Sequence, residues 1–145
     1  MTKQLTNSTM MQRVGVAAAA GVVPVVSDAI KLDKANGVLF GVVMGTIVAT
    51  GVVTIKAEVS DNNSDWDDVE GSEVVMGATE SDQIAVVEMG NVAQAYARVT
   101  VTRTVADSTV DGIIAVGTSP GISPIANHAS VGASVYLGSA VIGTP

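Results

Sequence analysis

Few side chains in this sequence are of the types that carry out acid–base, nucleophilic or metal chemistry. His128 is the only histidine and cysteine is absent, so a Ser-His-Asp triad or a histidine metal site would have to include His128. That residue lies in a segment rich in Gly, Ser and Ala, where a surface or interface histidine is far more common than a catalytic one. We therefore expect no catalytic residues and predict that the protein is not an enzyme.

A cluster of acidic and amide side chains, residues 61–65 (DNNSD), has the alternating oxygen ligands of a calcium-binding loop. The following positions do not fit, because Trp66 stands where such a loop requires Gly and Ser72 where it requires a bidentate Glu. Asp67 and Asp68 are neighbours in a strand and point to opposite faces, so they do not form a glycosidase pair. No glycine-rich phosphate-binding loop is present. We expect no metal ion and no cofactor.

Trp66, next to this cluster, suggests an alternative function. Aromatic rings stack on sugars in carbohydrate-binding β sandwiches, and Trp66 is a candidate for that role. A single ring is weak evidence, since the other aromatic residues are only Phe40, Tyr96 and Tyr136. A Trp that caps one end of a hydrophobic core is the more common case. A carbohydrate-binding or adhesin-type module is therefore kept as the alternative function.

The hydrophobic pattern around these residues predicts β-strands. From Val53 to Val59 apolar residues alternate with polar ones, which places one row on a buried face and the other in water. Residues 61–65 are of types that favour turns, so the chain should reverse there and form a hairpin. Residues 95–101 show the same two-residue period. The stretch from Val38 to Val48 is apolar on both faces, which is typical of a central or covered strand.

Composition and turn spacing predict a single all-β domain. The chain has 145 residues, enough to bury a core, and its abundant Val, Ala, Gly and Thr with only 3% aromatic residues favour sheets. We predict a jelly-roll-like antiparallel β sandwich of about eight strands with extended N- and C-terminal arms. An N-terminal arm with an apolar extended segment is expected at residues 1–28, the sandwich core at 29–117, and an apolar C-terminal arm or added strand at 118–145. We favour an arm that lies on another chain.

The charge pattern argues against two classes of partner. A net charge of −7 with only seven Lys and Arg disfavours nucleic-acid binding, which requires clustered cations. Residues 35–55 carry no charge, but glycines at 37, 41, 45 and 51 divide them into strand-length pieces, so we expect no membrane helix. Residues 14–26 resemble the apolar region of a signal peptide, yet residues 27–29 are a poor cleavage site. We expect neither nucleic acid nor a membrane as partner.

Four segments together resemble a known family of structural proteins. They are residues 51–66 (GVVTIKAEVSDNNSDW), 96–103 (YARVTVTR), 111–116 (DGIIAV) and 127–131 (NHASV). The combination is similar to the capsid cement, or decoration, proteins encoded in the head gene clusters of tailed bacteriophages, including short-tailed phages of Bordetella. The resemblance spans about residues 37–131, and the two ends are more apolar than expected of relatives.

The resemblance implies a jelly-roll-like protein without catalytic activity that assembles as a small oligomer on the major capsid protein. It predicts a cement protein on the outer surface of the virion capsid, where it stabilises contacts between major capsid subunits. A second copy of the chain is also expected as a partner, in a homodimer rather than a trimer.

We expect the partner-binding residues to be apolar side chains near both ends of the chain, because these would expose large apolar area in water. They are Met10, Met11, Val14, Val16, Ile122, Ile125, Val131, Tyr136, Leu137, Val141 and Ile142. Removal of the residues after Ser119 should then leave the domain folded but weaken its attachment to capsids. The acidic residues near the hairpin turn should face outward.

Overall fold

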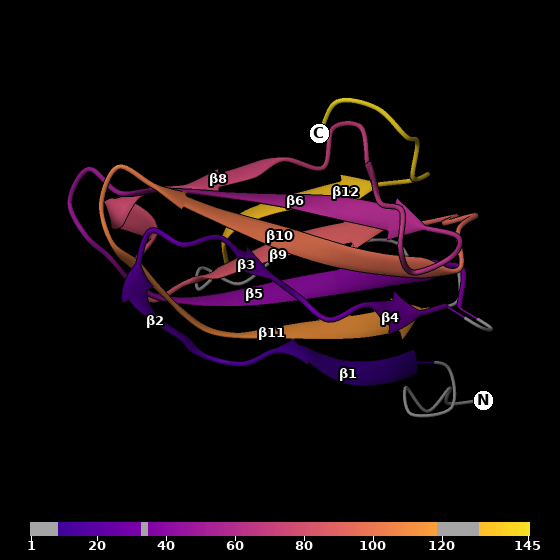
Figure 1. The fold of residues 1–145 in the computed structure, drawn as a ribbon, viewed down its shortest axis with the longest axis horizontal. Helices are drawn as coiled ribbons and strands as arrows, with labels where there is room; N and C mark the ends of the chain where they lie inside the picture. The colour runs from indigo at the N-terminus through magenta and orange to yellow at the C-terminus, as the bar shows by residue number, and fades with distance from the viewer. Residues whose placement is uncertain (1–8, 33–34, 119–130) are drawn as a thin grey trace.

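The computed structural model describes residues 9–32, 35–118 and 131–145 and is a β sandwich (Figure 1). Two six-stranded sheets pack face to face, and the helical structure of the described residues is a single 3-10 turn, Ala78–Glu80. This part of the chain contains no helix that is long and apolar enough to cross a bilayer. The predicted all-β sandwich is confirmed.

Each sheet takes strands from both halves of the chain. The first sheet has the order β1-β11-β5-β9-β12, with β2 also paired to β11. Its strands are β1 (Thr9–Gly15), β2 (Ala18–Gly21), β5 (Gly37–Ile47), β9 (Ile84–Met89), β11 (Ser108–Thr118) and β12 (Val131–Leu137). The second sheet has the order β3-β10-β6-β7, with β4 paired to β10 and β8 to β6. Its strands are β3 (Val25–Val26), β4 (Ile30–Lys31), β6 (Val52–Ser60), β7 (Asp67–Asp68), β8 (Val74–Met76) and β10 (Tyr96–Thr104).

The strand pairs are nested, as in a jelly roll. β1 and β2 pair with β11, β3 and β4 with β10, β5 with β9, and β6 with β7 and β8, so the chain is one long folded hairpin. Pairing of β11 with β5 and of β10 with β6 rolls this hairpin into two sheets. A jelly roll has eight strands, and three of these are each divided in two here: β1 and β2, β3 and β4, and β7 and β8. These splits and β12 account for the twelve strands of the described residues, where about eight were predicted.

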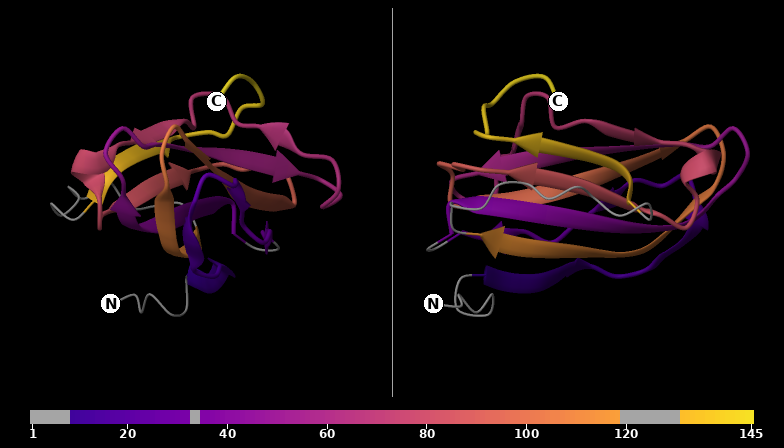
Figure 2. Two further views of the ribbon diagram at one scale, coloured as in Figure 1. Left: turned by 60° about the vertical axis from the view of Figure 1, so that its left-hand side comes forward. Right: turned by 180° about the vertical axis from the view of Figure 1, so that it is seen from behind.

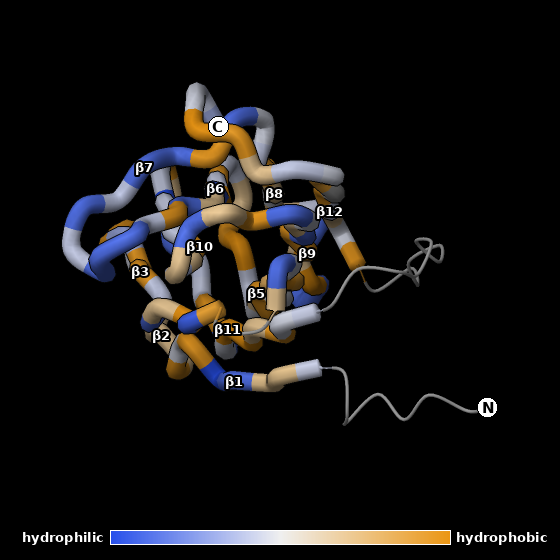
Figure 3. Tube along the Cα trace, turned by 90° about the vertical axis from the view of Figure 1, so that its right-hand side faces the viewer, coloured by the Kyte–Doolittle hydropathy of each residue, from blue (hydrophilic) through white to orange (hydrophobic). Residues whose placement is uncertain are grey.

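The predicted hairpin after β6 is present. In its turn the Asn62 side-chain oxygen accepts hydrogen bonds from the backbone N–H groups of Ser64 at 2.9 Å and Asp65 at 2.8 Å. Asn63 has a φ of 59°, a left-handed conformation that Asn tolerates. Figure 3 shows this loop as a hydrophilic segment next to β7. The inward row of β6 is no more than 1% exposed: Val53, Ile55, Ala57 and Val59.

The core between the sheets consists of many small apolar side chains. Phe40 is the one aromatic ring among the fully buried residues that the structure describes, and the others are mainly Val, Ile, Ala and Met. Burial of one Val or Ile side chain contributes about 1.5–3 kcal/mol. Stability is therefore spread over both sheets and does not depend on a few large rings.

The N-terminal segment belongs to the sandwich over residues 9–26, which differs from the predicted arm. β1 and β2 extend the first sheet, and β3 joins the second. Arg103 holds this segment, because its Nε donates to the Val23 carbonyl at 2.7 Å and its Nη1 donates to the carbonyls of Ala19 at 2.8 Å and Ser108 at 2.6 Å. Arg103 is 5% exposed, so these carbonyls replace the water that its buried charge loses.

The C-terminal segment adds a strand to its own first sheet, which corrects the preference for an arm on another chain. β12 lies along β9 and parallel to it, from Val131 opposite Ile84 to Leu137 opposite Met89 (Figure 2). Val135 and Leu137 pack against the core. β12 is the exception to the antiparallel pairing of the sandwich, because an alternating pattern specifies the two faces of a strand but not its direction.

Removal of the residues after Ser119 should destabilise the sandwich, contrary to the sequence-based expectation. The truncation deletes β12, leaves β9 as an unpaired edge, and exposes core surface beneath Val135 and Leu137. We expect the melting temperature to fall by about 5 °C or more, since each kcal/mol corresponds to roughly 2–4 °C at this size. Circular dichroism melting measures the effect, with Ser139→Ala at an exposed position as the control. An unchanged melting temperature would show that β12 is dispensable for folding.

Candidate interaction surfaces

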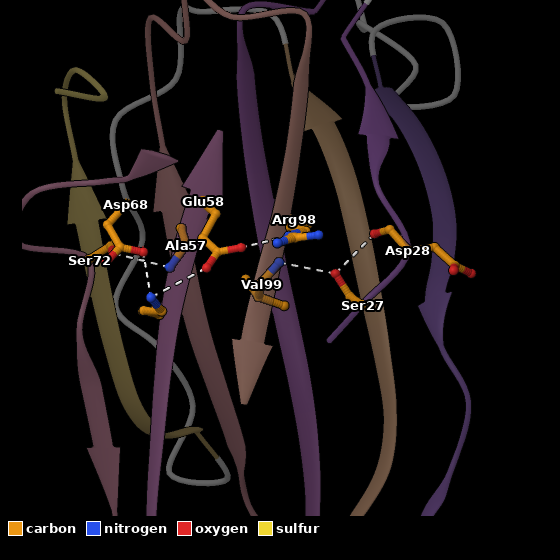
Figure 4. A network of polar contacts seen from close by, with 9 residues as sticks. Ser27, Asp28, Ala57, Glu58, Asp68, Ser72, Arg98 and Val99 are labelled. Carbon is orange, nitrogen blue, oxygen red and sulfur yellow. Dashed lines mark hydrogen bonds and ion pairs between the residues drawn. The ribbon is translucent and has the colours of Figure 1, made fainter. Parts of the chain in front are cut away.

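Charged side chains form a network on the outer face of the second sheet (Figure 4). Alternation along β6 and β10 directs Lys56, Glu58 and Arg98 outward, while the residues between them are buried. The strand register sets Arg98 opposite Glu58, and Glu58 opposite Asp68 of β7. Three strands thus bring Arg98, Glu58 and Asp68 into one row, and Lys56 lies beside it, two residues before Glu58 on β6.

Glu58 is the centre of this network. One of its carboxylate oxygens accepts a hydrogen bond from Arg98 Nε at 2.6 Å, and the other lies 3.3 Å from Lys56 Nζ, which also donates to Asp68. The Glu58 side chain is 11% exposed, so its charge needs these cations. The hydrogen bond with Asp68, reinforced by Glu58, raises the pKa of Lys56 although burial opposes the shift. The network supplies charge balance and no unpaired nucleophile or base.

Two buried serines support the strands beneath this network. The Ser72 hydroxyl accepts a hydrogen bond from the Ala57 backbone N–H at 3.0 Å, and the Ser27 hydroxyl accepts one from the Val99 N–H at 3.0 Å (Figure 4). These serines satisfy backbone donors of β6 and β10 where short neighbouring strands have ended. The backbone N–H groups of Ala57 and Val99, next to Glu58 and Arg98 in the chain, therefore both have hydrogen-bond partners.

Trp66 packs on the network. The guanidinium carbon of Arg98 lies 4.1 Å from the centroid of the Trp66 ring, a cation–π distance. Trp66 is half-buried, and Arg98 covers one face of its ring. The two roles expected for Trp66 from the sequence are a sugar-stacking ring and a cap on the core. The contact with Arg98 lends no support to sugar stacking on the covered face.

The outer face of the first sheet is mostly apolar. Val38, Phe40 and Val42 fill the core, so the residues between and after them on β5 point outward. The register sets Gly41 between Val86 of β9 and Ile114 of β11, and Val116 of β11 lies between Leu39 and Met11 of β1. Charged residues also lie on this face, among them Glu88 of β9 opposite Leu39 and Arg13 of β1 opposite Ile114. The half-buried or exposed apolar residues of this face are Leu39, Val43, Ile84, Val86, Ile114 and Val116.

The predicted partner residues near the N-terminus separate into two groups. Met10, Met11 and Val16 are exposed at 40%, 75% and 63%. Val14 is 1% exposed and belongs to the core of its own chain, which corrects its assignment to a partner surface. Val14 lies on the same side of β1 as Gln12, which is opposite the buried Ala115, so ordinary alternation directs Val14 into the sandwich.

The predicted partner residues near the C-terminus lie along one edge of the molecule. Val131 and Leu137 are half-buried in β12, and Tyr136 lies in the same strand opposite Glu88. Val141 and Ile142 are exposed at 53% and 51%, the latter paired with Val69 through an isolated backbone bridge. The other two predicted residues, Ile122 and Ile125, lie outside the described residues.

The described part of the chain contains no cluster of potential metal ligands. Within residues 9–32, 35–118 and 131–145, no three His, Cys, Asp or Glu side chains lie close enough together to hold a metal ion. His128, the one candidate for catalytic chemistry in the sequence, lies outside these ranges.

Replacement of Glu58 by Gln should destabilise the fold by about 1–2 kcal/mol. The change leaves Lys56 and Arg98 near each other without their shared carboxylate, and the partial exposure of both cations limits the cost. Urea unfolding at pH 7 measures the difference, with Glu73→Gln at an exposed position as the matched control. Equal midpoints for the two variants would contradict a stabilising network.

The raised pKa of Lys56 predicts a stability change at high pH. A group whose pKa is raised on folding stabilises the folded state fully below its pKa in the unfolded chain, which is about 10.4 for Lys. This stabilisation is lost as the pH rises through the pKa of the folded state. The difference in melting temperature between the wild type and Lys56→Gln should be constant at about pH 7–9 and shrink above about pH 11. A difference that stays the same throughout would mean that the charge of Lys56 is not what stabilises the fold.

Among known proteins, similarity to this chain was found in the fold and not in the sequence. No known protein family matches the sequence, and no curated protein matches it. In structure, the chain is similar to the PBSX exported protein XepA, a phage-related protein, with a TM-score of 0.54 and 10% sequence identity. The alignment covers 99% of this chain and 50% of XepA, so the chain spans half the length of that protein. At this identity the likeness extends to the fold alone.

Proposed function

We propose that the protein is a structural cement protein, which binds the outer surface of a phage head and stabilises contacts between major capsid subunits. Two kinds of similarity support this role: the sequence segments that resemble phage cement proteins, and the fold shared with a phage-related protein. We propose no catalytic activity. The role requires a rigid scaffold with a surface suited to association, and the outer face of the first sheet is the candidate for that surface.

The observation that carries the proposal is the difference between the outer faces of the two sheets. On the second sheet, the charges of Lys56, Glu58 and Arg98 are paired within the chain. The first sheet instead presents apolar side chains outward, and its edge strand β1 exposes Met10 and Met11. A mostly apolar face next to an exposed edge is typical of an interaction site, while a paired polar face suits solvent.

Binding through the apolar face would work in the following way. The outer face of the first sheet, extended by β1, packs on the capsid and gains about 25 cal/mol for each Å² of apolar surface removed from water. The second sheet then faces solvent, together with the exposed acidic loop at residues 61–65. Its negative charge disfavours clumping of particles. Because burial of apolar surface drives attachment, added salt should weaken it little.

A double substitution on the apolar face tests this proposal. Met11→Glu with Ile114→Glu places two carboxylates on exposed positions of that face, where the fold tolerates them. We expect at least a tenfold loss of affinity for phage heads assembled without this protein, because the contact would remove both carboxylates from water and only the one at position 114 has a cation, Arg13, opposite it. Co-sedimentation at 0.1 and 0.5 M NaCl measures binding.

The matched control places two carboxylates on the opposite face, as Thr54→Glu with Thr102→Glu, a pair of outward residues on β6 and β10. This control should bind like the wild type at both salt concentrations. Equal binding of the Met11/Ile114 variant, or loss of wild-type binding at the higher salt, would overturn attachment through the apolar face.

A further inference from the structure

Three loops at one end of the sandwich expose apolar side chains together. They are the β2–β3 loop with Val22 and Val23, the β5–β6 turn with Val48, and the β10–β11 turn with Val105, which lie at the left of Figure 1. The Val48 backbone N–H donates to the Asp107 carbonyl at 3.0 Å, which joins the second and third loops. The hydrogen bond from Arg103 to the Val23 carbonyl attaches the first loop. We call this set, Val22, Val23, Val48 and Val105, the loop end.

The valines of the loop end are far more exposed than the valines that pack in the core. Their exposed fractions are 49% for Val22, 69% for Val23, 46% for Val48 and 74% for Val105. The loop at the other end of β6, residues 61–65, is by contrast exposed and wholly polar. The two ends of β6 therefore carry surfaces of opposite character.

Val105 is also held in a strained conformation. Its φ is 70°, and the Ala106 backbone N–H donates to the Thr104 carbonyl at 2.8 Å, which makes a three-residue γ-turn centred on Val105. A β-branched residue in the left-handed region is unusual, and Gly or Asn would adopt this turn at lower cost. The strain points to a role for an apolar side chain at this tip.

The charges around the loop end indicate the chemistry of its partner. Asp107 belongs to the β10–β11 turn, and the Asp82 backbone N–H donates to the Gly45 carbonyl at 3.0 Å, which places Asp82 beside the β5–β6 turn. Glu80 lies two residues before Asp82, and its pKa is lowered by a hydrogen bond from the Gly77 N–H, so it is charged at neutral pH. The cation close to these loops in the described chain, Arg103, is buried and bound to carbonyls. A complementary surface is apolar and bordered by Lys or Arg.

We propose that the loop end is a second docking surface, which inserts into an apolar, Lys- or Arg-bordered depression on a neighbouring capsid subunit. This inference rests on the proposed function and deepens it. A protein that bridges two subunits must contact both, and the loop end lies at one end of the sandwich while the apolar face lies along its side. One copy can thereby bind one subunit through the face and the next through the loop end.

The variant Val105→Asn separates binding from folding. Asn tolerates the left-handed turn and removes the apolar side chain, so the melting temperature should stay the same or rise while affinity for heads lacking this protein falls about tenfold. Thr50→Asn is the matched control. Thr50 lies in the β5–β6 turn with a φ of 71°, so the change relieves similar strain without loss of an apolar group. Thr50→Asn should bind like the wild type.

The outcomes distinguish this inference from the proposed function. Wild-type binding with a selective loss in Val105→Asn, and a further loss in Val23→Ser with Val105→Asn, supports the loop end as a docking surface. Wild-type binding that neither variant weakens overturns the loop end and leaves the cement role standing. Failure of the wild type to bind heads overturns both. A lower melting temperature for Val105→Asn would contradict the strain on which the argument depends.

Discussion

Pairing between segments far apart in the chain is the constraint on which this structure depends. β11 pairs with β1 and β2 from the N-terminus as well as with β5, and β10 pairs with β3, β4 and β6. Ordering so long a chain costs conformational entropy, which only the burial of the core between the two sheets offsets. Arg103 adds specific hydrogen bonds between distant segments, since its guanidinium donates to the carbonyls of Ala19, Val23 and Ser108. Without cysteines, no covalent link assists this closure.

The sequence was sufficient for elements whose signal is local. The two-residue period identified β6 and β10, and the Asp, Asn and Ser residues after β6 identified the turn. It was insufficient for β1, β2 and β3, where short runs of Ala and Val interrupted by Gly and Pro carry no clear period. Their place depends on β10 and β11, about 75–110 residues later, which a local pattern cannot report. Val14 illustrates this limit, because its burial follows from the pairing of β1 with β11.

The candidate surfaces were predictable to a similar extent. Apolar residues near the N-terminus were expected at a surface, and Met10, Met11 and Val16 are exposed. The apolar outer face of the first sheet was missed, although the stretch from Val38 to Val48, apolar on both sides, was a signal for it. The Glu58 network was also missed. Its four charged members come from three strands, and only the register shows that they are neighbours.

The nested pairing has a consequence for how the protein must be made. β1 leaves the ribosome long before β11, the partner that lies 93 positions beyond its end at Gly15. At synthesis rates of about 5–20 residues per second, β1 waits on the order of ten seconds for that partner. During this interval Met10, Met11 and an unpaired strand edge are accessible to other nascent chains. Concentration during synthesis, more than the stability of the finished fold, would then limit the yield of correctly folded protein.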